Sequence, residues 1–215
     1  MSEALTALSV PVVSGNVSLY NESPGRAIYP TPVVGMLGLL ERVDASVGQG
    51  FAAAGDVVVL VGDDGALDGS EYAGGARGRP REVDVTREVA TIELVLAAAE
   101  EGILSSAHDV SGGGLAAALA ESAIAGGLGA EVDLAPGRRD DEVLFGEGGG
   151  RVLLTLRPER LGRLHELAAR EAVPMEPIGT VGGTDVVARV GGREARLPLG
   201  EARDAHERGL PEALA

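Results

Sequence analysis

The chain has 215 residues, enough for one large domain or two small ones, and its hydrophobic content is 45% although only 2% is aromatic. A formal net charge of −15 disfavours binding to nucleic acid or to an anionic membrane surface. All 18 basic residues are Arg and no Cys is present, which excludes a P-loop lysine, disulfides, a thiolate nucleophile and Cys-based metal sites.

The first 43 residues predict a helix stub and two or three strands. Ser2–Leu8 is typical of a short helix, an opening strand is expected from Pro11, and Val33–Leu40 has the apolar run of a buried strand. The segment Met1–Val10 lacks the pattern of a secretory signal, and no apolar run approaches the roughly 18 residues of a membrane span. We therefore expect a cytoplasmic protein with no membrane and no nucleic-acid partner.

Small polar residues crowd the stretch Pro11–Ser23, where a structural strand would alternate apolar side chains. Gly15 inside this stretch marks either a bulge or a place where a ligand approaches the backbone. Asn16 beside it offers an amide oxygen of the kind that Mg²⁺ prefers. An ordinary Gly/Asn/Ser turn is the alternative, and spacing alone leaves both interpretations open.

A composition shift over 43–55 indicates a domain boundary, and strands and helices alternate after it. The spacing predicts a surface loop over 69–84 and a helix from Thr86 to Gly102, with Thr86 as N-cap and Val89, Ile92, Leu96 and Ala99 on its buried face. The other expected strands are 57–61, 103–108, 131–134, 151–156, 178–181, 186–190 and 194–197, and the other helices are 115–125, 158–171 and 200–208, with a charged loop at 136–142. This alternation predicts an α/β or α+β domain whose helices cover a mixed sheet.

Two glycine-rich turns, 109–114 and 145–150, follow or precede expected strands. The turn 109–114 joins an expected strand to a helix N-terminus, a geometry that can bind an anion but that is also an ordinary sharp connection. Of the three histidines, His108 alone lies near such a turn, whereas His165 and His206 fall on charged helices. No Ser-His-Asp or Cys-His arrangement follows from the sequence.

Four strings decide between these interpretations by likeness: PVVSGNVSLYNES and AIYPTPVVGMLGLLE, then AHDVSGGGLAAALAES and, more loosely, LFGEGGGRVLLTL. In this order they resemble the second half of phosphoribosylformylglycinamidine (FGAM) synthase in its small-subunit form, a family of the AIR-synthase superfamily. The likeness implies that residues 1–43 are the end of a lobe that contributes to a β-barrel. Residues 44–215 would then be an AIR-synthase-like C-terminal lobe with a mixed sheet covered by helices.

The resemblance also implies functions for three residues. Gly15 matches a position that contacts ATP, Asn16 a Mg²⁺ ligand and Ser18 a contact to the substrate, formylglycinamide ribonucleotide (FGAR). In the family, ATP phosphorylates the amide oxygen of FGAR and ammonia displaces the phosphate. The implied partners are the missing N-terminal half, a glutaminase subunit and a small accessory subunit, and the isolated chain is expected to be inactive.

The sequence departs from the family pattern at two places. Gly112 stands where the family usually has Asp, and Gly148–Gly149 stands where it has a Ser-Gln pair after the Glu matching Glu147. Both changes remove polar groups, so we expect the nucleotide-like pocket of this lobe to be structural or degenerate. The alternatives are another ATP enzyme of the superfamily, such as AIR synthase, thiamine-monophosphate kinase or a hydrogenase maturation factor, and a non-catalytic assembly module.

Overall fold

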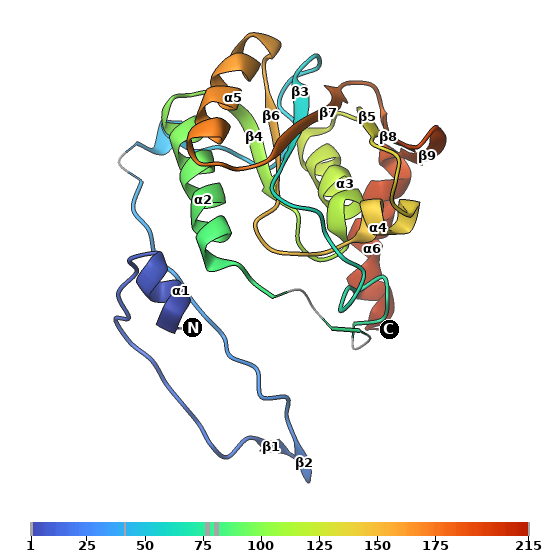
Figure 1. The fold of residues 1–215 in the computed structure, drawn as a ribbon. Coiled ribbons are helices and arrows are strands. Elements are labelled where there is room, and N and C mark those ends of the chain that lie inside the picture. Colours follow the sequence, from blue (N-terminus) through green and yellow to red (C-terminus); the bar gives the residue numbers. More distant parts are fainter. Residues whose placement is uncertain (1, 41, 76–77, 80–81, 215) are drawn as a thin grey trace.

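A computed structural model describes residues 2–40, 42–75, 78–79 and 82–214. Its main feature is a seven-stranded sheet with the order β4-β6-β3-β7-β5-β8-β9 (Figure 1). The strands are β3 (Val57–Val61), β4 (Leu104–Asp109), β5 (Ala130–Leu134), β6 (Val152–Leu156), β7 (Met175–Val181), β8 (Asp185–Val190) and β9 (Arg193–Pro198). Only β5 and β8 pair in parallel, and the other neighbours are antiparallel. The expected mixed sheet is thus confirmed.

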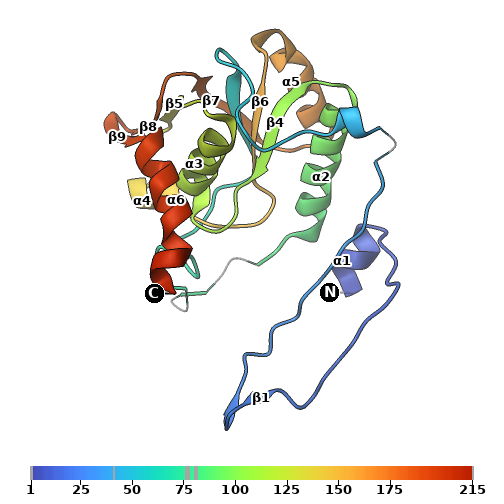
Figure 2. The ribbon, with the colours of Figure 1, turned by 180° about the vertical axis from the view of Figure 1, so that it is seen from behind.

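Two hydrophobic clusters lie on opposite faces of this sheet. Side chains alternate across a strand, so Val58 belongs to one cluster and Val59 to the other. Leu115 and Leu119 of α3 (Gly114–Gly126) cover the first face. Residues of α2 (Val85–Glu100) and α5 (Leu161–Arg170) cover the second. Helices α4 (Asp140–Phe145) and α6 (Leu199–Ala213) lie on the α3 side, which Figure 2 shows from behind, and a 3-10 turn, η2 (Pro158–Arg160), precedes α5.

The N-terminal part of the chain runs outside these layers. Helix α1 (Ser2–Ala7) packs on α2. The chain then leaves as an extended loop, residues 9–40, which we call the strap. At its tip the two-residue strands β1 (Glu22–Ser23) and β2 (Arg26–Ala27) form a hairpin, and η1 (Val43–Ala45) follows the strap (Figure 1). Residues 24 and 25 form the turn between these two strands.

The strands expected at Pro11 and over Val33–Leu40 are wrong for this chain. Neither segment forms a strand, and every residue from Pro11 to Leu40 is exposed. A strand needs a neighbouring backbone to pair with, and beyond the hairpin tip no described residue supplies one. The boundary predicted between residues 43 and 44 stays a prediction, although Phe51 is the first buried residue.

Two helices differ locally from the expectation. Asp84, not Thr86, is the N-cap of α2, because its carboxylate accepts from the amides of Thr86 and Arg87 at 3.0 and 3.2 Å. The buried face of α2 is Thr91, Leu94 and Ala98, whereas Ile92 and Leu96 point outward. Part of the expected charged loop at 136–142 is helical, because α4 begins at Asp140 with three acidic residues in its first turn.

Candidate functional site

The three residues with expected binding functions all lie on the strap. Gly15, Asn16 and Ser18 are exposed, and a Cβ added at Gly15 would meet nothing within 4 Å. The carbonyl of Ser18 accepts a hydrogen bond from Asn21 Nδ2 at 2.7 Å, a local turn contact. The three residues are neighbours in the chain, but the structure does not bring them to a cavity of the folded lobe. Their functions stay predictions.

The lobe itself has a cavity of about 520 Å³ at the end of the sheet where β3 ends. Its walls come from four segments far apart in the sequence: the turn after β3, the first turns of α2, the glycine-rich loop before β6 and the segment before β7. The lining side chains with polar groups are Asp63, Asp68, Glu82, Asp84, Thr86, Arg87, Glu88, Thr91, Glu147 and Glu171. Residues 147–150 of the glycine-rich loop therefore border a cavity, whereas the turn 109–114, for which anion binding was the alternative, does not line it.

Close backbone packing explains the glycines in this wall. A Cβ at Gly62 would lie 1.9 Å from the carbonyl oxygen of Gly150, and one at Gly65 would lie 2.3 Å from that of Gly146. Gly62 also has a φ of +96°, which L-residues rarely adopt. At Gly149 an added Cβ would meet Glu88 Oε1 at 2.1 Å, so the Glu88 carboxylate fills the space that a side chain at this position would need.

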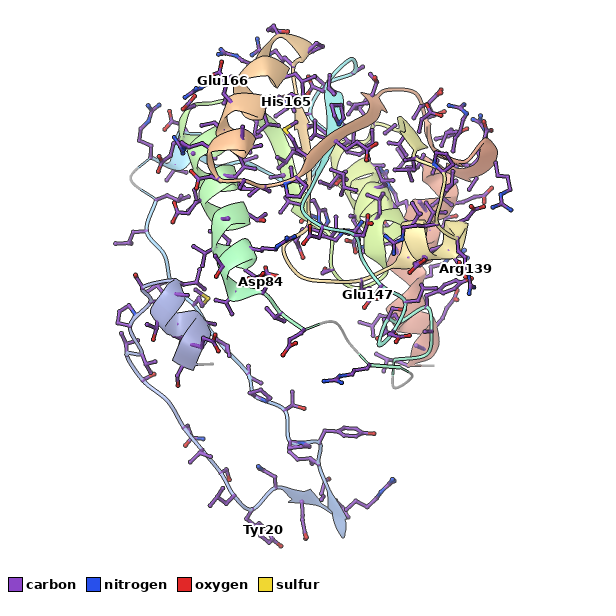
Figure 3. All side chains as sticks on the ribbon, viewed as in Figure 1. Tyr20, Asp84, Arg139, Glu147, His165 and Glu166 are labelled. Atoms are coloured by element: carbon purple, nitrogen blue, oxygen red, sulfur yellow. The ribbon has the colours of Figure 1, made fainter. Side chains whose placement is uncertain are left out.

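Glu147 ties the loops around the cavity together. Its Oε1 accepts from the backbone N–H groups of Gly113 at 2.8 Å and of Glu71 at 2.9 Å. Its backbone pairs with Ala66 through two hydrogen bonds of 2.8 Å. The stacked rings of Tyr72 and Phe145, with centroids 4.6 Å apart, add a further contact between the same loops. Figure 3 shows Glu147 and Asp84 at the same end of the lobe, with Tyr20 far away on the hairpin tip.

The cavity is strongly acidic. Seven of the lining residues are Asp or Glu and one is Arg, and Arg87 already pairs with Asp63 and, at 3.6 Å, with Asp84. A bare phosphate would be repelled here, so an anionic ligand would need cations of its own. Within the described residues no group of three or more His, Cys, Asp or Glu could hold a metal. The expectation of a structural or degenerate pocket stays a prediction.

Sequence reasoning did not find Asp84, Arg87 and Glu88 as lining residues. In the sequence these residues belong to a charged loop and to the start of a helix, and neither pattern indicates a cavity. The cavity becomes evident only in the fold, where the first turns of α2 and the loop 147–150 line the same space.

His108 borders a different hollow, of about 390 Å³, together with Glu121 and His206. Its ring is nearly buried, with Nδ1 2.7 Å from the carbonyl oxygen of Asp109 and Nε2 3.1 Å from Glu121 Oε2. Because a carbonyl oxygen only accepts, Nδ1 carries a proton. Its Nε2 faces Glu121 of α3 but has no hydrogen-bond partner among the described residues. His108 does not line the acidic cavity, and His165 and His206 are exposed.

None of the described helices is both long enough and apolar enough to cross a bilayer. The comparisons with known proteins agree on one relationship. Residues 53–191 match the family model described as AIR synthase related protein, C-terminal domain.

Among curated proteins, the phosphoribosylformylglycinamidine synthase subunit PurL of Moorella thermoacetica is 44% identical over 221 residues, which is all of this chain and 30% of that protein. The PurL subunit of Caldanaerobacter subterraneus is 43% identical over 205 residues, covering 93% of this chain and 28% of that one. The chain thus spans less than a third of the length of these curated relatives.

Solved structures give the same picture for the fold. The structure described as Thermotoga maritima PurL complexed with ATP matches with a TM-score of 0.66 and 23% identity, covering 75% of this chain and 28% of that one. The same protein complexed with AMPPCP matches with a TM-score of 0.61 and 27% identity over 75% of this chain and 28% of that one. The family model covers more than half of the 215 residues, and the chain therefore belongs to the AIR synthase related proteins, of which it contains the C-terminal domain.

Proposed function

We propose that this chain is the C-terminal part of an FGAM synthase of the PurL type, an ATP-dependent C–N ligase of purine biosynthesis that converts FGAR to FGAM. The observation that carries the proposal is the 44% identity to the Moorella thermoacetica PurL subunit over the whole chain, strap included. ATP would phosphorylate the amide oxygen of FGAR, and ammonia would displace the phosphate to give the amidine. Such a transfer depends chiefly on positioning and charge neutralisation.

In this proposal Gly15 contacts ATP, Asn16 is a ligand of Mg²⁺ and Ser18 contacts FGAR. All three residues are exposed on the strap. This supports a function at an interface, because they can contact a site whose other residues belong to another part of the synthase. The Mg²⁺ assignment fits only in part. Asn16 supplies one amide oxygen, and the described residues contain no cluster that could hold the ion. The remaining ligands would come from the rest of the synthase.

The exposure of the strap also supports the proposed partners. The two halves of the strap expose large apolar side chains such as Val13, Leu19 and Leu37. Extended segments of this kind tend to pair with another chain segment. The first partner is the part of the synthase that this chain lacks. Supply of ammonia would need a glutaminase subunit and a small accessory subunit, and the complex would be cytoplasmic.

A chimera tests this proposal. Residues 1–215 replace the matching 30% of the Moorella thermoacetica subunit, and phosphate release and FGAM formation are measured with FGAR, ATP and ammonium. The chimera should be active and the isolated chain inactive. Conversion of FGAR by the isolated chain at a comparable rate, or a correctly folded chimera without activity, would contradict the proposal. A chimera that hydrolyses ATP but leaves FGAR unchanged would point to another ATP enzyme of the superfamily.

Single substitutions in the chimera test the residue assignments. Asn16→Ala should lower kcat by about 100-fold, the size of effect seen when one group that stabilises developing charge is removed. Ser18→Ala should raise the KM for FGAR about tenfold. Ser23→Ala is the control, since it removes an exposed polar side chain from the same strap, and it should change kcat less than threefold. Equal effects at positions 16 and 23 would contradict the assignment of Asn16.

A further inference from the structure

Helix α2 is apolar on two faces, and only one of them packs on the sheet. Leu94 and Ala98 are fully buried in the core. The opposite side carries what we call the outer stripe, formed by Val89, Ile92, Leu96 and Ala99. Ile92 is 41% exposed and Leu96 is 51% exposed. A surface helix of a domain that stands alone normally has polar residues on this side, so the outer stripe is typical of a helix with a second packing partner.

The structure shows part of such packing already. Helix α1 packs on α2, and three of the residues here are half-buried: Ala4 and Leu5 of α1, and Leu8, which follows it. Ile92 and Leu96 stay open to solvent despite this contact. Helix α1 and the strap lie on the same side of the lobe as α2 in both views (Figures 1 and 2), away from α6. Helix α2, which carries the outer stripe, is therefore on the side of the lobe from which the strap extends.

We propose that the outer stripe of α2 is a docking surface for the part of the PurL-type polypeptide that this chain lacks. The inference rests on the proposed function for the identity of the partner. Its supports are the length of the relatives, of which this chain spans 28–30%, and the packing of α1 on the same helix. The partner presents an apolar surface, because neither Ile92 nor Leu96 can offer a hydrogen bond.

Thiol labelling measures the docking directly, because the 215-residue chain has no Cys of its own. Leu96→Cys is introduced into the isolated chain and into the chimera with the Moorella thermoacetica subunit. The rate of maleimide labelling at this position is followed by peptide mass spectrometry. We expect labelling in the chimera to be at least about 100-fold slower than in the isolated chain. Leu210→Cys on α6, where the native side chain is 69% exposed, is the matched control and should label at similar rates in both.

A second variant tests the same docking without a thiol, so that a local effect of the introduced Cys cannot account for the result. The double substitution Ile92→Glu and Leu96→Glu should lower the Tm of the chimera by at least about 5 °C while leaving that of the isolated chain within about 2 °C. The same pair of charges at Leu210 and Leu214 should affect neither protein. An unchanged chimera Tm would overturn the proposal.

The remaining outcomes are equally decisive. Equal labelling of Leu96→Cys in chain and chimera would show that the rest of the synthase does not cover the stripe. Concentration-dependent protection in the isolated chain would make a second copy the occupant and would also overturn the proposal. Labelling does not depend on catalysis, so a protected but inactive chimera would contradict the proposed function alone. An active chimera with an exposed Leu96→Cys would contradict this inference alone.

Discussion

The strap and the lobe contain similar apolar runs, but the run in the strap is exposed and the run in the lobe is buried. Val33–Leu40 is as apolar as Val57–Val61, yet the first is exposed throughout and the second forms the buried central strand β3. The difference lies in the neighbours, since β3 pairs with β6 and β7 and the arms of the strap pair with nothing in the described chain beyond the hairpin tip. An apolar run shows that a segment needs burial, and the surrounding chain decides whether it is buried.

Replacing one leucine by alanine in each region should give the largest difference in the free energy of unfolding between the lobe and the strap. Leu154→Ala removes a side chain that is 0% exposed and should lower the free energy of unfolding by about 3 kcal/mol, the usual cost of a cavity in a core. Leu37→Ala removes one that is 97% exposed and should cost less than about 0.5 kcal/mol. Urea unfolding of both variants measures the two values. A large loss at Leu37 would mean that the strap packs on the lobe in solution.

Two glycines allow a comparison of backbone packing. A Cβ at Gly179 in β7 would lie 2.0 Å from the carbonyl oxygen of Glu131, whereas one at Gly15 would meet nothing. We expect Gly179→Ala to cost about 2 to 3 kcal/mol by overpacking and Gly15→Ala to be neutral in the isolated chain. Thermal unfolding provides the check. In the chimera, Gly15→Ala should instead reduce ATP affinity without lowering the Tm.

Glu147 tests whether the loops around the cavity depend on one side chain. Glu147→Ala leaves the amides of Gly113 and Glu71 without their acceptor and should cost about 2 kcal/mol, while Glu147→Gln keeps an acceptor and should cost about 1 kcal/mol. Hydrogen exchange at these two amides should accelerate in the same order. Unchanged exchange in the alanine variant would show that other groups hold the loops.

The smallest effect concerns an exposed ion pair in the lobe. Arg163 donates two hydrogen bonds to Glu101 and so joins α5 to the end of α2, which lowers the pKa of Glu101 below its ordinary value of 4.5. Because the folded-state pKa is the lower one, the stabilisation is complete above about pH 4.5 and is lost as the pH falls through the folded value. Glu101→Gln should therefore lower the Tm slightly, and by more at pH 7 than at pH 3, and salt should weaken the difference. Equal losses at both pH values would exclude the ion pair as the cause.

Much of the lobe could be predicted from the sequence, because its signals are local and agree with one another. The run Val57–Val61 and the stripe with Leu164 and Leu167 on α5 each match the buried face that forms. The face of α2 could not be chosen, since Leu94 and Leu96 are both apolar and only the sheet decides which points inward. The sequence predicts the N-cap of α2 at Thr86, two residues too late, because Asp84 is the last residue of the predicted surface loop.

The acidic cavity was beyond reach of the sequence for a different reason. Strand β3 is antiparallel to both β6 and β7, so the turn after β3 lies beside the segments that precede β6 and β7. The first turns of α2 complete the wall. No spacing between residues 63, 87 and 147 records this arrangement. The site residues on the strap came from likeness alone, and the fold of this chain gives them no common cavity.

The distribution of tyrosines between the two regions has a practical consequence. The chain has no Trp and three Tyr. Tyr20 and Tyr29 on the strap are 80% and 88% exposed, whereas Tyr72 in the lobe is 56% exposed and has one ring face stacked on Phe145. Intrinsic fluorescence of this chain is thus tyrosine emission from two distinct environments. A quencher such as iodide should reach the strap tyrosines more readily than Tyr72. The fraction of the fluorescence that iodide quenches should therefore fall when the strap becomes buried in a larger assembly.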